Sequence, residues 1–348
     1  QKTAYEIYQC DWSSDVCSSD LGYSGGELLK LLADHSKFEV SYIAAGSNAG
    51  ELISSVHPQL TMYEGQKFQS TQLAGMADCD LVFFALPHGE SAHWIAQLGE
   101  GVKVVDLGAD FRLEDSSQWE KYYGGKFAGS LPYGLPELPG ARATIASSKR
   151  VANPGCYATS IILGSLPAIT HNLIDSTDLV VVAASGTTGA GRSAKVNLLG
   201  SEVMGSLSSY KFGGIHQHTP EIEQALKKVS GKNVGLSFTP ILAPMPRGIL
   251  TTISAKINGP LNTAKVHEIY SEAFASEAFV HVLPIGQMPQ TNAVSGTNST
   301  HIQVAVDEHA NRLIISVALD NLGKGAAHQA LQNANIMCGF REDEGLPL

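Results

Sequence analysis

The sequence has no apolar run near the roughly 20 residues that a membrane-spanning helix needs, although 43% of its 348 residues are hydrophobic. Its first residues lack the basic and then apolar pattern of a secretory signal peptide. Basic clusters are also missing, and the formal net charge is −10. Because nucleic acids and many membrane surfaces are negatively charged, an acidic chain binds them poorly. We therefore expect neither nucleic acid nor membrane among the partners.

Cysteine is scarce, and no pair has zinc-ligand spacing with its companions; the five cysteines are Cys10, Cys17, Cys79, Cys156 and Cys338. So few cysteines in a chain of this length do not form a disulfide framework. Because free thiols are typical of reducing compartments, the sequence predicts a cytoplasmic protein. We also expect it to hold no metal ion.

The length suggests two domains, since single hydrophobic cores stop growing at about 250–300 residues. In the first part, buried-strand patterns alternate with helical ones. The strands are expected in FEVSYIAAG, CDLVFFALPHG and VKVVDLGADF, and the helices in GELLKLLADH and SAHWIAQLGEG. This alternation predicts an α/β fold with a parallel sheet, a Rossmann-type dinucleotide-binding domain over residues 1–152.

A second pattern follows a loop rich in glycine and proline. Strand-like segments are grouped with few helices between them: LVVVAASGTTGAGR, VGLSFTPILAP, GILTTISAKI and HIQVAVDEHANRLIISVALD. The grouping predicts an α+β domain over residues 153–318. The last periodic segment, GAAHQALQNANIMCGF, predicts a helix within residues 319–348.

Gly22 and Gly25 have the spacing of the last two glycines of a dinucleotide-binding turn, and a helical segment follows them directly. Backbone N–H groups at such a helix start favour phosphate. We therefore expect Gly22, Tyr23, Ser24 and Gly25 to contact a cofactor. Ser19 stands where the first glycine of the turn belongs, and a surface helix capped by glycine is the alternative.

The strand expected after this helix ends in YIAAGSNAG, without the acidic residue that binds a ribose 2′-hydroxyl. Ser47 and Asn48 stand there instead, which leaves room for a 2′-phosphate and favours NADP(H) over NAD(H). Two polar residues in a loop also need no ligand at all, so this alternative stays open.

Cys156 follows an Asn-Pro-Gly turn and opens an apolar-periodic helix. The helix macrodipole and its free N–H groups stabilise a thiolate at that place. The sequence therefore predicts a lowered pKa for Cys156 and a nucleophile at neutral pH. The alternative is a small buried hydrophobic residue.

A thiolate nucleophile usually has a base, and the segment GGIHQHTPEIEQAL offers His216 and His218. Alternation in an extended segment points both imidazoles the same way. The pair could bind a metal, but no neighbouring residue suggests a third ligand. A polar helix entry is the simpler alternative.

Five motifs in unbroken order, NPGCYATS, SGTTGAGR, GIHQHTPEI, SFTPILAPMPRGIL and DNLGKGAA, together resemble the N-acetyl-gamma-glutamyl-phosphate reductase family, which is related to aspartate-semialdehyde dehydrogenase. The resemblance runs from about Gly22 to the C-terminus. It implies reduction of N-acetyl-glutamyl 5-phosphate by NADPH to N-acetyl-glutamate 5-semialdehyde and phosphate, in arginine biosynthesis. It also implies a homodimer or homotetramer, and a C-terminal segment that returns to the cofactor domain.

The resemblance also implies roles for single residues. Cys156 matches the nucleophile that forms a thioester, and His216 matches the catalytic acid/base. The implied substrate-binding residues are Asn153, Arg112, Arg192, Tyr133, His218, Glu221 and Arg247. The implied cofactor-binding residues, besides the glycine turn and Ser47, are Pro87, His88, Gly89, Ser185, Gly186, Asn321 and Gly325.

The segment before Gly22, YEIYQCDWSSDVCSSDL, is polar, serine-rich and acidic where the family has an apolar strand. A polar segment conflicts with burial in the middle of a parallel sheet. We interpret residues 1–21 as a foreign segment joined in frame. The chain as written should then lack the central strand and bind NADPH poorly.

Three other functions stay open. An aspartate-semialdehyde or glyceraldehyde-phosphate type dehydrogenase would share the thioester chemistry. A thiol hydrolase would use Cys156 and His216 without a cofactor. A non-catalytic binding protein on the same fold would use neither residue chemically.

Overall fold

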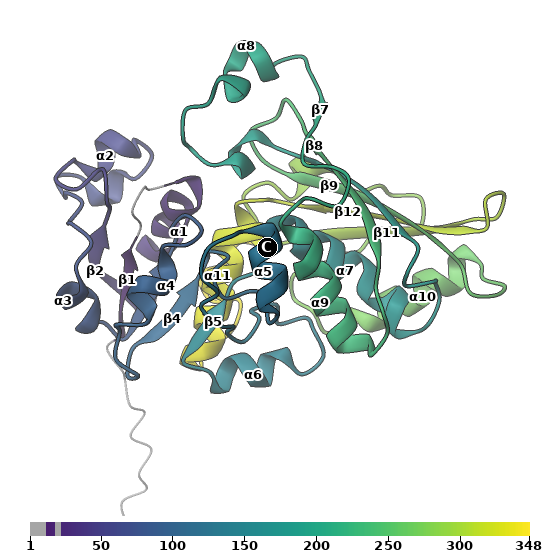
Figure 1. The fold of residues 1–348 in the computed structure, drawn as a ribbon, viewed down its shortest axis with the longest axis horizontal. Helices are drawn as coiled ribbons and strands as arrows, with labels where there is room; N and C mark the ends of the chain where they lie inside the picture. The colour runs from purple at the N-terminus through teal and green to yellow at the C-terminus, as the bar shows by residue number, and fades with distance from the viewer. Residues whose placement is uncertain (1–11, 18–21) are drawn as a thin grey trace, which may run out of the picture.

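The computed structural model describes residues 12–17 and 22–348, and it contains two sheets joined side by side (Figure 1). The first sheet is entirely parallel, with the strand order β2-β1-β3-β4-β5. Its strands are β1 (Trp12–Cys17), β2 (Phe38–Ala44), β3 (Leu81–Phe84), β4 (Lys103–Asp106) and β5 (Arg150–Ala152). The predicted Rossmann-type parallel sheet is confirmed.

Helices cover both faces of this sheet, because alternate residues of each buried strand point to opposite sides. Leu81 and Phe83 of β3 pack with α1, while Val82 and Phe84 pack with α4. The helices here are α1 (Tyr23–Ala33), α2 (Ile53–Val56), α3 (Leu73–Ala77), α4 (Ser91–Ile95), α5 (Ser116–Tyr122) and α6 (Ala141–Ser147), with the 3-10 turn η1 (Thr61–Tyr63).

Residues 12–17 form β1, an interior strand of the first sheet that pairs with both β2 and β3. The expectation that the chain lacks a central strand is therefore wrong for the backbone. Ladder hydrogen bonds use main-chain groups, which every residue except proline carries in full, and this segment contains no proline. Its register against β2 shifts between Ser14 and Val16. Residues 1–11 and 18–21 lie outside the described residues, and the foreign origin of residues 1–21 stays a hypothesis.

The second sheet is mixed and has the order β10-β11-β12-β9-β6-β8-β7. The predicted strand-rich second part is confirmed. Its strands are β6 (Leu179–Ser185), β7 (Ser208–Ser209), β8 (Leu236–Leu242), β9 (Ile249–Lys256), β10 (Val280–Val282), β11 (Thr300–Asp307) and β12 (Arg312–Leu319).

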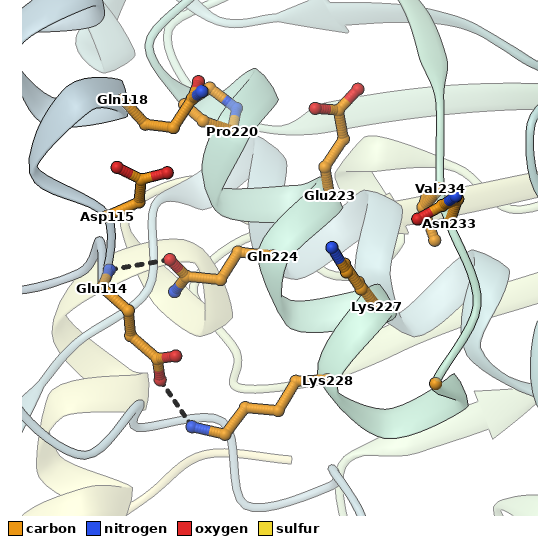
Figure 2. Close-up of a pocket in the computed structure, with 11 residues that line it drawn as sticks. Glu114, Asp115, Gln118, Pro220, Glu223, Gln224, Lys227, Lys228, Asn233 and Val234 are labelled. Carbon is orange, nitrogen blue, oxygen red and sulfur yellow. Dashed lines mark hydrogen bonds and ion pairs between the residues drawn. The ribbon is translucent and has the colours of Figure 1, made fainter.

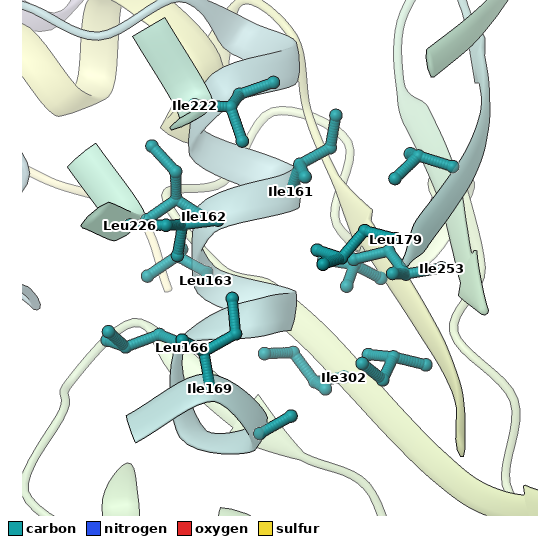
Figure 3. Close-up of a cluster of buried hydrophobic side chains, with 14 of the residues drawn as sticks. Ile161, Ile162, Leu163, Leu166, Ile169, Leu179, Ile222, Leu226, Ile253 and Ile302 are labelled. Carbon is teal, nitrogen blue, oxygen red and sulfur yellow. The ribbon is translucent and has the colours of Figure 1, made fainter. Parts of the chain in front are cut away.

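One face of this sheet is buried under the helix α7 (Cys156–Thr170), as Figure 3 shows. Ile161 of α7 packs in one cluster with Leu179 and Ile253 of the strands. The same face carries α9 (His218–Ser230) and α10 (Thr263–Ala273). The opposite face exposes alternate residues of the central strands, among them Val180, Val182 and Leu250.

Two further segments complete the fold. The segment after β6 carries η2 (Thr187–Ala190), η3 (Val196–Leu198) and α8 (Gly200–Val203), and α8 stands out at the top of Figure 1. After η4 (Thr291–Ala293) and β12, the chain forms the π-helical turn η5 (Gly323–Ala327) and α11 (His328–Cys338). Leu331 and Met337 of α11 share a core with α1 and β3, so the C-terminal helix packs on the first sheet.

Among the described residues, no helix is both long and apolar enough to cross a bilayer. Cys156 is a free thiol. The cytoplasmic location stays a prediction.

Candidate active site

Cys156 lies where the two sheets meet. It follows the carboxyl end of β5 by way of residues 153–155 and is the first residue of α7. Gly155 caps the helix in an extended conformation, and a Cβ there would lie 2.4 Å from Nε2 of His218. Only glycine leaves room for this imidazole beside the cysteine. The predicted helix-terminal position of Cys156 is confirmed.

A buried carboxylate holds the turn before the cysteine. Oε1 of Glu221 accepts a hydrogen bond of 2.8 Å from the N–H of Gly155 and one of 2.7 Å from the Tyr133 hydroxyl. Nη1 of Arg112 lies 3.6 Å from Oε2 of the same carboxylate. The structure therefore brings together three residues predicted to bind substrate, but their polar groups bind one another and the cysteine turn.

The Arg112 side chain also donates hydrogen bonds to backbone carbonyls. Its Nε donates to the Asn153 carbonyl at 2.7 Å, and its Nη2 donates to the Leu107 carbonyl at 2.8 Å. The Asn153 side chain is engaged as well, since its Nδ2 donates to the Ala326 carbonyl at 3.1 Å. Both side chains therefore brace the turn before Cys156.

Burial controls the ionisation of the nucleophile. It raises the pKa of the Cys156 thiol to about 11, while the N–H of Tyr157 and the charge of Arg112 act in the opposite direction. The predicted lowering of this pKa is therefore wrong. Burial destabilises the thiolate by more free energy than the helix terminus contributes to stabilise it. A base must therefore take the proton of the thiol.

The two candidate bases occupy different positions. His218 opens α9, and its imidazole packs against Gly155. His216 lies behind it among the rings of Tyr157 and Phe238, with ring centroids 5.4 and 5.0 Å away. Nδ1 of His216 accepts the backbone N–H of His218 at 3.1 Å, so His216 fixes the helix start.

Both imidazoles are neutral at pH 7. Burial, aided by the neighbouring His218 and Lys211, lowers the pKa of His216 to about 2, and burial lowers the pKa of His218 well below its usual range. Nδ1 of His218 is buried and has no hydrogen-bond partner among the residues that the structure describes. An unpartnered buried nitrogen is costly, and such an atom is suited to binding a ligand or moving a proton.

The π-helical turn η5 closes the other side of the cysteine. A Cβ on Gly325 would lie 2.8 Å from Cβ of Cys156, so this position tolerates only glycine. Nearby, the amide of Asn321 joins two loops, since its oxygen accepts the N–H of Gly248 at 2.8 Å and its nitrogen donates to the Thr188 hydroxyl at 3.0 Å. These two residues, predicted to bind cofactor, shape the wall beside the nucleophile.

The loop that begins at Ser185 also contains a glycine that close contact requires. A Cβ on Gly186 would meet the backbone of Pro246 and Arg247 at 2.8 Å. The hydroxyl of Ser185 donates to the Gly186 carbonyl at 3.2 Å. Glycine is therefore required at 186 by backbone contact, which lets η2 turn toward the first domain.

Arg247 is not a free anion binder. Its guanidinium donates to both oxygens of Glu27, at 2.9 and 3.1 Å, and lies 2.8 Å from Oδ2 of Asp320. Glu27 belongs to α1 and Asp320 follows β12. Arg247 therefore clamps the first domain onto the second.

A cavity of about 930 Å³ lies between the domains. Of the predicted cofactor-binding residues, Gly22, Ser47, Pro87 and His88 line it, as does Arg192. Gly89 adjoins it with φ +92°, and its N–H donates to Asp110 Oδ1 at 2.6 Å. The predicted contacts Tyr23, Ser24 and Gly25 lie in the first turn of α1 and are not among the lining residues.

Sequence reasoning missed a buried ion pair beside the site. Nζ of Lys324, in η5, lies 2.6 Å from Oε1 of Glu137 and from Oε1 of Gln332. Lysine and glutamate are almost never fully buried unless paired, and the pairing partners here are far apart in the chain. Lys195, which lines the interdomain cavity, was also missed, although it stands close to Arg192 in the sequence.

A second hollow of about 660 Å³ lies between α5 and α9, and none of the predicted site residues lines it (Figure 2). Its polar groups bind one another: Glu114 accepts Lys228 at 2.5 Å, and its N–H donates to Gln224 at 2.7 Å. We assign no ligand to it. Among the described residues, no three His, Cys, Asp or Glu side chains gather to hold a metal ion.

Two family models match this chain. Residues 21–147 match the family model "Semialdehyde dehydrogenase, NAD binding domain", and residues 156–321 match "Semialdehyde dehydrogenase, dimerisation domain". The predicted fold class, a Rossmann-type domain plus an α+β substrate and dimerisation domain, is confirmed.

Curated relatives match nearly the whole chain. A protein of Acidothermus cellulolyticus is 55% identical over 93% of this chain and 95% of its own, and one of Arthrobacter sp. (strain FB24) is 50% identical over 96% and 98%. Both are named N-acetyl-gamma-glutamyl-phosphate reductase.

Solved structures share the fold at low identity. The Vibrio cholerae aspartate semialdehyde dehydrogenase II complexed with ASA has a TM-score of 0.71, with 16% identity over 94% of this chain and 98% of that one. The Candida albicans aspartate semialdehyde dehydrogenase with NADP has a TM-score of 0.66, with 16% identity and the same coverage.

Proposed function

This chain belongs to the N-acetyl-gamma-glutamyl-phosphate reductase family, and on that premise we propose that it reduces N-acetyl-glutamyl 5-phosphate to N-acetyl-glutamate 5-semialdehyde and phosphate with NADPH, in arginine biosynthesis. Relatives named for this activity are 48–55% identical to the chain, whereas the aspartate semialdehyde dehydrogenase structures are 14–17% identical. This difference favours the acetylglutamyl substrate over the aspartyl one.

The observation that carries the proposal is the enclosure of Cys156. The thiol opens α7 at the junction of the sheets, with His218 against Gly155 on one side and Gly325 on the other. In the proposed first step, the sulfur attacks the acyl carbon, the bond from that carbon to the phosphate oxygen breaks, and phosphate leaves. The product is a thioester on Cys156, and the thiol proton passes to a base.

We assign the acid/base role to His218 rather than to His216. Its imidazole packs against the cysteine turn, and its Nδ1 is buried without a partner among the described residues. A bound substrate with phosphate and carboxylate charges would raise the pKa of a nearby imidazole. His218 can then accept the proton of the thiol and later return a proton as the aldehyde leaves.

The residues around the interdomain cavity fit a nicotinamide dinucleotide. Gly22 presents a helix start of the kind that binds phosphate, and Ser47 and Asn48 stand where an acidic residue would disfavour a 2′-phosphate. NADPH bound there would supply a hydride to the thioester carbon, and the carbon–sulfur bond would then break to release the aldehyde and the Cys156 thiol. We propose NADP(H) as the cofactor on these grounds.

We also propose the domain division 1–152, 153–318 and 319–348, a cytoplasmic location, and a homodimer or homotetramer. The match to a dimerisation domain supports self-association. So does the uncovered face of the second sheet, where Val180, Val182 and Leu250 are exposed.

The proposal is tested by trapping the thioester. Wild-type protein mixed with the acyl phosphate in the absence of NADPH should gain one acyl group by intact-mass spectrometry, and adding NADPH should remove it. Cys156→Ser should gain none, whereas the control Cys338→Ser, in α11, should behave as wild type.

Two results would count against the proposal. Phosphate release by Cys156→Ser at the wild-type rate would exclude the covalent route. An adduct that water removes as fast as NADPH does would favour the thiol hydrolase instead.

A further inference from the structure

The interdomain cavity has one wall from each domain. Gly22, Ser47 and Val56 belong to the first domain, while residues 189–193 and Lys195 come from the segment after β6. In a doubly wound sheet, ligands bind outside the carboxyl ends of the strands where the strand order reverses. Here that place lies between β1 and β3, and Gly22 and residues 85–88, which follow these two strands, line the cavity. The cavity is therefore where a dinucleotide would lie.

Arg192 reaches across this cavity. Its Nη2 donates to the carbonyl of Val56, the last residue of α2, at 2.8 Å. A guanidinium has five N–H donors, and this is the single hydrogen bond of the Arg192 side chain to the residues that the structure describes. The side chain is exposed toward the cavity, so most of its donors are available to an anion.

Lys195 adds a second positive charge to the same wall. Its ammonium group forms no ion pair or hydrogen bond with residues 22–348. Among the described residues that line the cavity, Glu51 is the one carboxylate. Two cations thus face the loop of Ser47, the loop that in this fold lies beside the adenosine ribose.

We propose that Arg192, with Lys195 beside it, binds the 2′-phosphate of NADPH from the second domain and thereby makes the enzyme prefer NADP(H) to NAD(H). The inference rests on the proposed function and names a cofactor-specificity role for Arg192 in place of the substrate-binding role that the family resemblance implies. The contact with Val56 supports it, because α2 follows the ribose-side loop of the first domain.

The test is a calorimetric titration of 2′,5′-ADP and of 5′-AMP into the full-length protein. These probes differ only in the 2′-phosphate. Wild type should bind 2′,5′-ADP about tenfold or more tightly than 5′-AMP, since charge-assisted contacts to phosphate are strong. Arg192→Ala should lose most of this ratio while its affinity for 5′-AMP stays unchanged. Lys195→Ala should lose part of the ratio, and Arg192→Lys should keep part of it.

Arg341→Ala is the matched control, because Arg341 lies on the surface in a pair with Asp343 and should keep the wild-type ratio. An unchanged ratio in Arg192→Ala overturns the inference and leaves the proposed function standing. An equal loss for both nucleotides also overturns it, since Arg192 would then shape the cavity through Val56. If wild type binds neither probe, the proposed cofactor itself fails, and the inference with it.

Discussion

At the scale of the residue, the chemistry of Cys156 depends on its neighbours more than on its place in the helix. The thiol is held protonated by burial, with a pKa of about 11. The groups that surround it are neutral imidazoles and the Glu221 carboxylate, whose Oε1 accepts hydrogen bonds from Gly155 and Tyr133 and whose Oε2 lies 3.6 Å from Nη1 of Arg112. Cys156 is therefore a thiol before the reaction, and it becomes a nucleophilic thiolate only when a base takes its proton.

The assignment of the base gives a prediction that separates the two histidines. His218→Asn should slow thioester formation by about 10²–10⁴-fold, the usual contribution of a positioned acid/base. His216→Asn should slow it less, because His216 packs behind His218 and contacts its backbone N–H. Single-turnover acylation followed by intact mass measures both rates.

The reverse order of effects would return the acid/base role to His216, as the family resemblance implies. Circular dichroism of both variants is the control for folding, since each imidazole packs against aromatic rings.

At the scale of the element, short irregular pieces position the site. The π-helical turn η5 brings Gly325 against Cys156 and buries Lys324 with Glu137. This ion pair links η5 to the loop before α6. The turn therefore depends on a charge pair that sequence periodicity cannot reveal, because its partners are 187 positions apart.

The buried pair predicts a large stability effect. Lys324→Met should destabilise the protein by about 3–5 kcal/mol, because it leaves the Glu137 carboxylate buried without its cation. The double variant Lys324→Met/Glu137→Leu should recover much of this loss. Denaturant unfolding measures the difference.

The surface pair Lys265–Glu268 offers the control, since both side chains are more than half exposed. Lys265→Met should leave the unfolding midpoint close to that of wild type, because exposed ion pairs contribute little to stability. A Lys324→Met protein as stable as wild type would show that Glu137 does not need its partner.

At the scale of the whole molecule, the two domains are joined by charge as well as by the apolar core around α11. Arg247 binds Glu27 of α1 and Asp320, and Nε2 of His328 lies 3.1 Å from the same Glu27. Burial would raise the pKa of Glu27, but hydrogen bonds from His328 and Arg247 outweigh burial and lower the pKa to about 2.

The ion pairs of Glu27 predict that acid lowers the free energy of unfolding. A carboxylate whose pKa is lower in the folded protein stabilises it above the unfolded pKa of about 4.5, and the stabilisation is lost as pH falls toward 2. Between pH 7 and pH 3, wild type should lose about 2 kcal/mol more than Glu27→Gln. Urea unfolding at a series of pH values measures the two slopes, and parallel slopes would remove Glu27 from the clamp.

Much of the fold could be predicted from local pattern. Alternating buried strands and helices indicate a parallel sheet, and the position of Cys156 after a turn indicates a helix start. The interior strand β1 could not be predicted in this way, because pairing in a sheet depends on main-chain groups and on two neighbouring strands. A polar composition argues against burial, but it does not remove a single ladder hydrogen bond.

The sequence alone determined the two-domain α/β class, the helix-terminal cysteine, the histidine pair and the family resemblance, since each is a local pattern that survives without partners. Only the tertiary structure decided that Arg112 and Arg247 are already paired, that His218 rather than His216 packs on the cysteine turn, and that Arg192 crosses the cleft. It also reversed the expected pKa shift of Cys156. The reason is that ionisation and side-chain availability depend on burial and on partners far away in the chain, such as Glu27, 220 positions from Arg247.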